Sequence, residues 1–491
     1  MVKTPRNIRH RSPLMKKYCR ILQIAALLSA AGHVACSSSI AGENQRRLKF
    51  MDVFPEADRA GAHVQARSHA MPHSFLDGQW GGIVAAGDGK TYFGFSAHSD
   101  TDNAQFYSYD PKQDKVTHII DVGRWCGEDN VGTVNSQGKI HSWIYEVDGK
   151  LYMSSTMAHK PEGYPYKGGH FLSYDLETGK CEDLGRYDDS RGGLLTMLYE
   201  PVYRRLYAIS QGDQTLVYYD ISKRKIVEVG PVEDNAHHCR TLISDRFGNV
   251  YGSTWAGMIY RYNPNTNAIS SLLTTIPYDP KAPQPKPNPA RPMVSYDAKE
   301  DHWKSVYDGA QLAWHSTHWV PMVWDPVTKW WYGVRGNDEY LFRLRTPVDG
   351  TDPRAVVEGL VQFGFRPSEQ QPRFASMGMC LKDRTLYYCS YPTWRSMAHL
   401  MSYNIDEGTV TDHGPIVLED GRRVSEIHAL VVGGDGNLHA AAMVWSIEGK
   451  DPANDHGERA SCYIHCRLLI IDPAAHFKNA DGARRWARET K

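Results

Sequence analysis

The feature that most constrains the fold of this chain is a segment that recurs along it. The stretches His141 to Tyr152, Arg240 to Tyr251 and His428 to His439 align position for position. Each reads as an apolar strand, a glycine-containing turn such as Asp-Gly or Phe-Gly, and a second short strand, which is a strong hairpin signal. A hairpin that recurs at long intervals predicts a repeat architecture.

A third and a fourth strand follow most of these hairpins. The third strands share an aromatic residue followed by Asp or Asn, as in Phe106 to Pro111, Phe171 to Leu176 and Leu400 to Ile405. Four antiparallel strands repeated every 40 to 60 residues or so are typical of a β-propeller. We therefore predict an all-β fold, a seven-bladed β-propeller of four-stranded antiparallel blades, with blades starting near residues 80, 139, 194, 238, 318, 374 and 426. A strand near Leu48 to Val53, or one from the C-terminus, is expected to close the ring.

The N-terminus has the pattern of an export signal. Basic residues precede the apolar run Ile21 to Ala31, which is too short to span a bilayer. Residues 1–41 are interpreted as a signal peptide, or as a lipoprotein signal that ends before Cys36. The propeller is predicted over 42–475, followed by a C-terminal tail over 476–491 that we expect to form a short helix. The protein is predicted to be periplasmic, secreted or lipid-anchored at the cell surface, with no integral membrane segment.

The composition and net charge of the chain limit the kinds of partner that we expect. The 491 residues carry a formal net charge of zero, which gives no support for nucleic acid as a partner. With 41% hydrophobic and 23% charged residues, a globular protein is expected, and we predict a monomer. The Cys462-Tyr-Ile-His465-Cys466 cluster could hold zinc, but a buried thiol pair or a local disulfide is the simpler explanation. The metal content therefore stays open between none and a structural zinc or calcium ion.

Several blades place a titratable residue at an equivalent position. In a propeller, the loops that precede the first and third strands open on the same face, and the first strands line the central channel. His141, His170, Arg240 and His428 are therefore expected to face one funnel. Any one of these residues is more often structural, but convergent titratable groups in a concave site indicate function. The expected substrate-binding residues are Arg191, His238, Trp255, His318, Arg373 and His428.

The residue types in this funnel favour β-elimination on an acidic sugar. Glu426 is the sole acidic residue near the channel, which disfavours a two-carboxylate glycosidase, and no serine-hydrolase elbow or phosphate loop occurs. An arginine grips a uronate carboxylate with two N–H groups and stabilises the charge that develops when the C5 proton leaves. A histidine or tyrosine then moves the protons. Tyr199, Tyr218 and Tyr251 are the candidate tyrosines, and this chemistry requires no cofactor.

Two motifs carry a resemblance to a known family. Lys139-Ile-His141-Ser-Trp143 and Gly168-Gly-His170-Phe-Leu-Ser-Tyr-Asp175, together with the export signal and the blade pattern, resemble the propeller polysaccharide lyases that cleave ulvan. The resemblance covers most of residues 50–475. It implies an exported lyase that cuts a sulfated, uronate-containing polysaccharide, with His141 and His170 as acid–base or substrate-holding residues and Arg240 as the neutraliser. The loop from His159 to Gly169 is longer than that pattern predicts. The alternative is a non-catalytic propeller that binds carbohydrate or protein at the cell surface.

Overall fold

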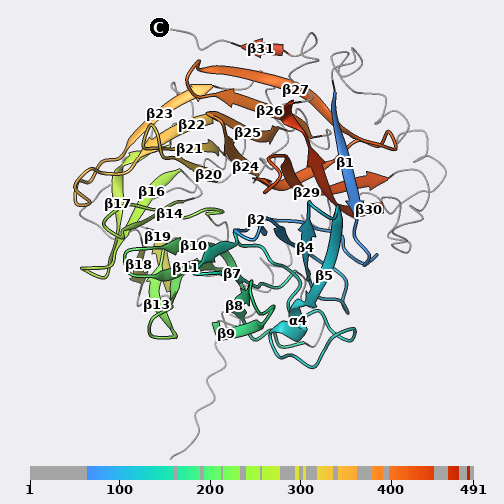
Figure 1. The fold of residues 1–491 in the computed structure, drawn as a ribbon. Helices are drawn as coiled ribbons and strands as arrows, with labels where there is room; N and C mark the ends of the chain where they lie inside the picture. The colour runs from blue at the N-terminus through green and yellow to red at the C-terminus, as the bar shows by residue number, and fades with distance from the viewer. Residues whose placement is uncertain are drawn as a thin grey trace, which may run out of the picture.

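Four-stranded antiparallel sheets follow one another along the chain, and the protein is an all-β propeller (Figure 1). The computed structural model describes residues 63–158, 164–187, 193–211, 214–232, 239–254, 257–276, 294–297, 302–305, 318–335, 341–361, 378–390, 398–446, 463–474 and 484–486. Five four-stranded sheets are separate from one another. The first contains β2 (Ile83–Ala85), β3 (Thr91–Phe95), β4 (Gln105–Asp110) and β5 (Lys115–Asp121), and the second contains β6 (Tyr145–Val147), β7 (Lys150–Ser154), β8 (Gly169–Asp175) and β9 (Cys181–Tyr187). The third contains β10 (Leu194–Glu200), β11 (Arg205–Ser210), β12 (Thr215–Asp220) and β13 (Lys225–Pro231), the fourth β14 (Ile243–Ser244), β15 (Val250–Ser253), β16 (Met258–Asn263) and β17 (Ala268–Thr275), and the fifth β20 (Trp319–Asp325), β21 (Trp330–Arg335), β22 (Leu341–Arg345) and β23 (Val356–Val361).

The last part of the chain forms one larger sheet in place of separate blades. It contains β24 (Met379–Lys382), β25 (Thr385–Ser390), β26 (His399–Asn404), β27 (Thr409–Leu418), β28 (Glu426–Val432), β29 (Leu438–Ser446) and β30 (Tyr463–Ile471). The N-terminal strand β1 (Val64–Ala70) pairs antiparallel with β30 and, over three residues, parallel with β27. The sheets therefore give five separate four-stranded blades and a continuous path of eight strands, not seven separate blades.

The ends of the chain differ from the sequence-based expectation. The strand that joins the N-terminal and C-terminal parts is Val64–Ala70, while the predicted strand near Leu48 to Val53 lies outside the described residues. In the tail, Arg484–Trp486 forms a strand, β31, that pairs with β27, so the expected helix is wrong for these residues. An unpaired outer strand offers free backbone N–H and C=O groups, and this explains why the tail adds to it as a strand. A further hairpin, β18 (Val294–Asp297) with β19 (His302–Ser305), forms a sheet of its own.

The hairpin turns follow from local sequence. Asp148 and Gly149 connect β6 to β7, and both have positive φ angles, 51° and 73°. Two positive φ values in a two-residue loop match the right-handed twist of the strands that the loop joins, and Asp-Gly adopts them at low cost. After β5, the short helix α4 (Val122–Trp125) begins where the carboxylate of Asp121 accepts the backbone N–H of Arg124. Such a capping contact fixes the start of a helix.

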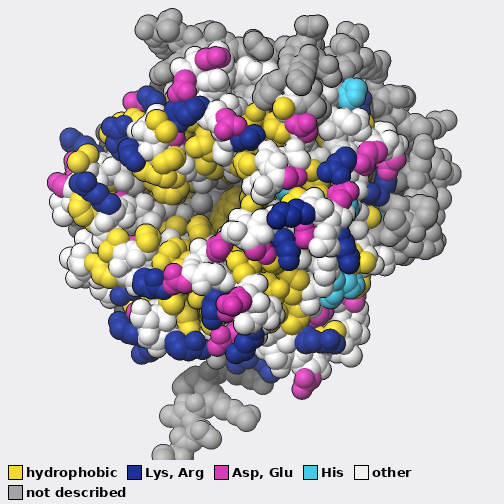
Figure 2. Space-filling model, viewed as in Figure 1, with side chains coloured by type: hydrophobic (Ala, Val, Ile, Leu, Met, Phe, Trp, Pro, Cys, Tyr) yellow, Lys and Arg dark blue, Asp and Glu magenta, His cyan; other side chains and the backbone are white. Residues whose placement is uncertain are grey.

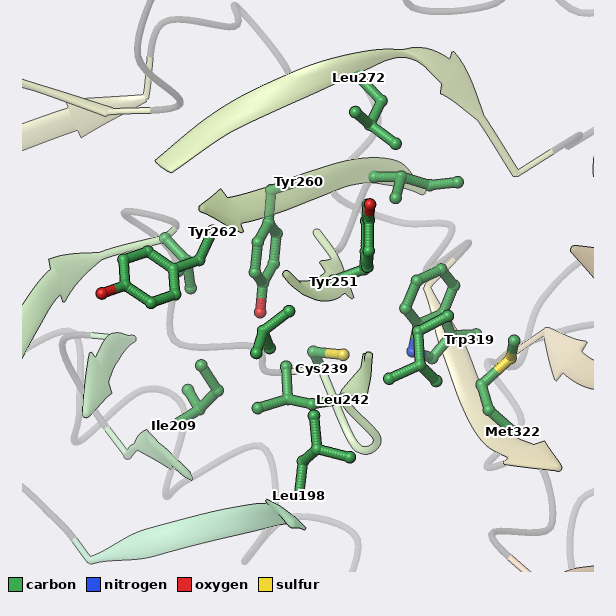
Figure 3. Close-up of a cluster of buried hydrophobic side chains, with 14 of the residues drawn as sticks. Leu198, Ile209, Cys239, Leu242, Tyr251, Tyr260, Tyr262, Leu272, Trp319 and Met322 are labelled. Carbon is green, nitrogen blue, oxygen red and sulfur yellow. The ribbon is translucent and has the colours of Figure 1, made fainter. Parts of the chain in front are cut away.

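The hydrophobic core lies mainly between neighbouring sheets. Figure 3 shows one such layer, where Leu198 and Ile209 of the β10 sheet, Tyr251 and Tyr260 of the β14 sheet, and Trp319 of β20 pack together. Trp319 is fully buried, and its indole N–H donates to the carbonyl of Thr241 at 2.6 Å. Full burial of one large apolar side chain contributes about 1.5–3 kcal/mol. Packing between sheets therefore makes each sheet depend on its neighbours.

The first strand of each sheet lies nearest the middle of the molecule. β28 contacts both β2 and β24, β24 contacts β20, and β10 contacts β14. Figure 1 shows β2, β20 and β24 closer to the centre than the outer strands β5, β23 and β27. Figure 2 shows a hollow in the middle of the ring with hydrophobic side chains on its walls. Residues just before the first strands are therefore placed to approach one another.

Candidate functional site

Three residues lie together around one tryptophan, Trp80: His141 and Arg240 from the segments just before β6 and β14, and His428 from within β28. The imidazole of His141 stacks on the Trp80 indole with ring centroids 5.0 Å apart and planes 17° apart. The imidazole of His428 stacks on the same indole at 5.3 Å and 19°. The guanidinium carbon of Arg240 lies 5.8 Å from the Trp80 ring centroid. Four residues from well-separated parts of the sequence thus form a single cluster.

Trp80 reaches His141 because two glycines follow it. A Cβ atom on Gly81 would lie 2.9 Å from the carbonyl oxygen of His141, and one on Gly82 would lie 2.8 Å from a side-chain carbon of Ile140. The backbone N–H of Gly81 donates to the His141 carbonyl at 3.2 Å. Real Cβ atoms do not tolerate such approaches, so glycine at both positions lets the two segments lie in contact.

Hydrogen bonds fix the tautomer of His141. Its Nδ1 lies 2.8 Å from the backbone carbonyl oxygen of Leu195, which is an acceptor, so Nδ1 carries the proton. Its Nε2 contacts the guanidinium of Arg240, which is a donor, so Nε2 presents a lone pair. The hydroxyl of Thr196 donates to the backbone carbonyl of Arg240 at 3.0 Å and holds that segment in place. His141 is therefore a neutral imidazole with its basic nitrogen turned toward a cation.

Two cations share this cluster. The ammonium nitrogen of Lys139 lies 4.6 Å from the Trp80 ring centroid. Burial and the neighbouring charge of Arg240 together lower the pKa of Lys139 to about 8, while the charge of Asp77 opposes the shift. Burial also lowers the pKa of Arg240 to about 10. Both shifts mean that the positive charges are poorly solvated here, so an anion bound between them would be strongly favoured.

His428 forms a pair with the carboxylate of Glu426. Its Nε2 lies 3.0 Å from Oε2 of Glu426, and its backbone N–H donates to the side-chain oxygen of Gln79 at 3.2 Å. The side-chain N–H of Gln79 in turn donates to the carbonyl of Trp80. The imidazole of His428 is buried, while Glu426 keeps a third of its side chain in solvent. The pair orients His428 against Trp80, as expected for a carboxylate that holds a histidine.

His170 lies in a different cluster. Its Nδ1 is 3.0 Å from the carboxylate of Asp183, and its Nε2 is 3.6 Å from that of Glu128. Although burial disfavours the charged ring, hydrogen bonds to Asp183, Cys126 and Glu128 raise the pKa of His170 to about 11. The side chain of Gln137 donates to Glu128 and so connects this cluster to the segment that carries His141. The structure gives His170 two carboxylate partners and places it outside the cluster that holds His141, Arg240 and His428, although all four were expected to face one funnel.

The same arrangement recurs at the start of another third strand. His399 at the start of β26 has its Nδ1 3.0 Å from Asp412 on β27. In both cases the aspartate also accepts the backbone N–H of a glycine two residues later, Gly185 after Asp183 and Gly414 after Asp412. Both glycines have positive φ, 129° and 89°, and the strand register shifts beside them. The Asp-x-Gly sequence after a third-strand histidine is thus a local signal for a buried ion pair.

The expected catalytic tyrosines lie in the body of the sheets. Tyr251 is fully buried in the core layer of Figure 3, and its hydroxyl donates to Asp245 at 2.7 Å. Burial and the Asp245 charge raise the pKa of Tyr251 far above its usual value. Tyr199, near the far end of β10 from Thr196, is partly buried against hydrophobic side chains of the neighbouring strands. Neither residue belongs to the cluster around Trp80.

Other expected site residues fall in several places. His318 is buried immediately before β20. Arg191, His238, Trp255 and Arg373 lie outside the described residues, as does Cys462 of the proposed metal cluster. Within the part of the chain that the structure describes, no group of three or more His, Cys, Asp or Glu side chains is arranged to hold a metal ion. In the same part, no helix is long and apolar enough to cross a membrane.

Sequence reasoning missed two members of the cluster, Trp80 and Lys139. Trp80 precedes Gly81, which aligns with His141 at the start of the repeated segment, so its position was visible in the repeat. Lys139 lies two residues before His141 in an extended segment that bridges to Thr156. Residues two apart in extended backbone point to the same side, and this spacing was the available signal.

Comparison with known proteins finds only distant similarities to solved structures. The sequence matches no family model and no curated protein. Among solved structures, it is similar to a luciferin-regenerating enzyme with 10% identity and a TM-score of 0.37, over 83% of this chain and 96% of that chain. A chain of the mitotic checkpoint complex shares 8% identity with a TM-score of 0.47, over 84% and 92% of the two chains. U3-55K shares 12% identity with a TM-score of 0.45, over 84% and 100%. The propeller assignment rests on the sheet topology above.

Proposed function

We propose that this protein is an exported polysaccharide lyase that cleaves a uronate-containing, ulvan-like sulfated polysaccharide by β-elimination. The observation that carries the proposal is the pair of cations, Arg240 and Lys139, beside the neutral imidazole of His141. Among the described residues, neither cation has a carboxylate ion-pair partner, and burial disfavours both charges. A substrate carboxylate supplies the missing negative charge and selects acidic sugars.

The proposed reaction uses the contact between Arg240 and His141 as its starting point. A uronate carboxylate accepts two N–H groups of the Arg240 guanidinium, which then no longer donates to Nε2 of His141. The freed lone pair takes the proton from C5 of the sugar, while Arg240 stabilises the enolate-like charge on the carboxylate. The C4–O bond breaks and a C4–C5 double bond forms. The chemistry requires no cofactor, because a guanidinium supplies the positive charge.

The proposal extends to the architecture and the cellular location. The continuous eight-strand path is proposed to act as two blades, β24 to β27 and β28-β29-β30-β1, which gives seven blades in all. Trp80 would then be flanked by His141 from the next blade in sequence and by His428 from the last blade. The segment 1–41 is proposed to direct export, and the protein to act as a monomer.

A panel of acidic polysaccharides tests the function. Purified protein is incubated with ulvan, alginate, pectate and hyaluronan, and the ultraviolet absorbance of the unsaturated uronate product is followed. We expect product from a uronate polymer, and a rate lower by on the order of a hundredfold or more for Arg240→Ala and for His141→Ala. Arg224→Ala is the matched control, because that arginine forms an exposed ion pair with Glu182 in another part of the molecule. Wild-type rates in both cluster variants would end this mechanism.

A binding module is the second candidate, and one contact favours it. Arg240 occupies the lone pair of His141 that a base requires, so the two cations could hold an acidic sugar or an acidic protein surface without proton transfer. A non-catalytic, cell-surface propeller of this kind predicts retention on immobilised polymer that depends on Arg240, with no new ultraviolet absorbance. The same panel therefore separates the two candidates.

A further inference from the structure

β-Elimination from a polysaccharide requires a proton for the departing glycosidic oxygen. An alkoxide is a poor leaving group, so an acid placed at this oxygen is expected to speed the reaction by about a hundredfold to ten-thousandfold. The tyrosines that the sequence suggested are poorly placed to supply this acid. Tyr251 lies in the core with its hydroxyl on Asp245, Tyr218 is buried in the same core, and Tyr199 is partly buried against hydrophobic side chains of neighbouring strands. Among the described residues, the next candidates for the donor lie in the cluster around Trp80.

Lys139 has the required position in this cluster. It lies two residues before His141, and its backbone N–H and carbonyl both form hydrogen bonds with the backbone of Thr156. Its ammonium nitrogen is 4.6 Å from the Trp80 ring centroid, and the Arg240 guanidinium carbon is 5.8 Å from the same centroid. The base, the carboxylate receptor and the Lys139 ammonium therefore surround one indole.

Lys139 also has the electrostatic character of a proton donor. Burial, together with the neighbouring Arg240 charge, lowers its pKa to about 8, so the amine is protonated at neutral pH and still gives up its proton readily. Arg240 is a weaker acid, with a pKa of about 10, and is engaged as the carboxylate receptor. His428 is bound through Nε2 to the Glu426 carboxylate. Among the described residues of the cluster, Lys139 is the best-matched acid.

We propose that Lys139 is a catalytic residue that protonates the departing glycosidic oxygen. This inference rests on the proposed lyase function. As His141 Nε2 takes the C5 proton, the electron pair of the C5–H bond forms the C4–C5 double bond and the C4–O bond breaks. The leaving oxygen takes a proton from Nζ of Lys139, which becomes a neutral amine. After product release, His141 returns its proton to solvent and Lys139 takes one up, so that the cycle closes.

Two substitutions separate the charge of Lys139 from its acidity. Lys139→Met removes both, while Lys139→Arg keeps the positive charge and does not release a proton in the working pH range. On polysaccharide, we expect kcat to fall by about a hundredfold or more in both variants, with KM of the arginine variant close to the wild-type value. The basic limb of the wild-type kcat profile near pH 8 should be absent in Lys139→Arg. Circular dichroism and thermal unfolding check that both variants are folded.

A substrate with an acidic leaving group provides the decisive control. A uronate that carries a phenol at C4 loses phenoxide without protonation, so both Lys139 variants should cleave it at near wild-type rates, whereas Arg240→Ala should remain impaired. Full activity of Lys139→Arg on polysaccharide, or failure of the phenol substrate to rescue the folded variants, overturns the role of Lys139 and leaves the lyase proposal standing. Absence of cleavage of either substrate by the wild-type protein overturns both.

Discussion

Replacement of His170 by glutamine tests whether this residue is a permanently charged structural group. The imidazole is 4% exposed and lies 3.0 Å from Asp183 and 3.6 Å from Glu128. A rise of the pKa from 6.5 to about 11 corresponds to about 6 kcal/mol at about 1.4 kcal/mol per unit, which is an upper bound for a buried pair. Removal of one partner from a buried ion pair typically costs about 3–5 kcal/mol, and we expect a loss in this range for His170→Gln.

The pH dependence of this loss in stability is the stronger test of the charge on His170. Since the folded pKa is raised, the folded protein binds one more proton than the unfolded chain between pH 6.5 and about pH 11. The stabilisation by His170 is therefore complete below pH 6.5 and falls by up to about 1.4 kcal/mol per pH unit above it. The difference between wild type and His170→Gln in the free energy of unfolding should narrow accordingly as the pH rises from 6.5 to 9.

Urea denaturation followed by tryptophan fluorescence measures this difference at each pH. His141→Gln is the matched control, because this buried histidine is bound to the Leu195 carbonyl and the Arg240 guanidinium in its neutral form. Its effect on stability should stay nearly constant over the same pH range. A constant difference for His170→Gln as well would show that its imidazole is neutral when folded, and would refute the ion-pair assignment.

Three further substitutions and one treatment have defined outcomes. Lys139→Met should raise the free energy of unfolding by about 1–2 kcal/mol at pH 7, because burial disfavours the lysine charge and partial solvation of the side chain reduces that penalty. As the pH rises from about 8 to 10.5 the lysine loses its charge, so the stability of the wild type should approach that of the variant, measured by urea denaturation. Tyr251→Phe should cost about 1 kcal/mol in thermal unfolding and leave cleavage unchanged, because its hydroxyl donates to Asp245 away from the cluster around Trp80. Gly193→Ala should cost about 1–3 kcal/mol in the same assay, since its Cβ would lie 2.3 Å from Cα of Thr156. Dialysis against a chelator should leave cleavage unchanged, because in the proposed mechanism Arg240, and not a metal ion, neutralises the substrate carboxylate.

The propeller could be predicted because its signals are local. The Asp148-Gly149 turn sets the geometry of its own hairpin, and the third strands repeat an aromatic residue followed by Asp or Asn. These patterns depend on residues that are close in sequence, so they survive without knowledge of the rest of the fold. The parallel pairing of β1 with β27 joins residues more than three hundred positions apart, and no local pattern announces it.

The candidate site, too, could be predicted from the sequence only in part. The repeat placed His141, Arg240 and His428 at the first position of the repeated segment, and this equivalence is a property of the sequence. Whether each side chain meets a carboxylate, a carbonyl or another ring was decided by the packing of neighbouring sheets. His170 was expected to face the same funnel as His141, yet the loop that carries Glu128 and the bulge that carries Asp183 enclose it. The packing of neighbouring sheets likewise decided that Trp80 and Lys139 belong to the cluster.

Sequence by itself thus determined the strands, their turns and the residues that begin each repeat, because backbone hydrogen bonds and turn geometry act between near neighbours. The tertiary structure alone decided that two imidazoles stack on Trp80 and that two cations share it. Burial and charge proximity depend on which sheets meet, and they set the pKa values of Lys139, Arg240 and His170. The chemistry of this protein therefore follows from contacts between sheets that the order of residues does not reveal.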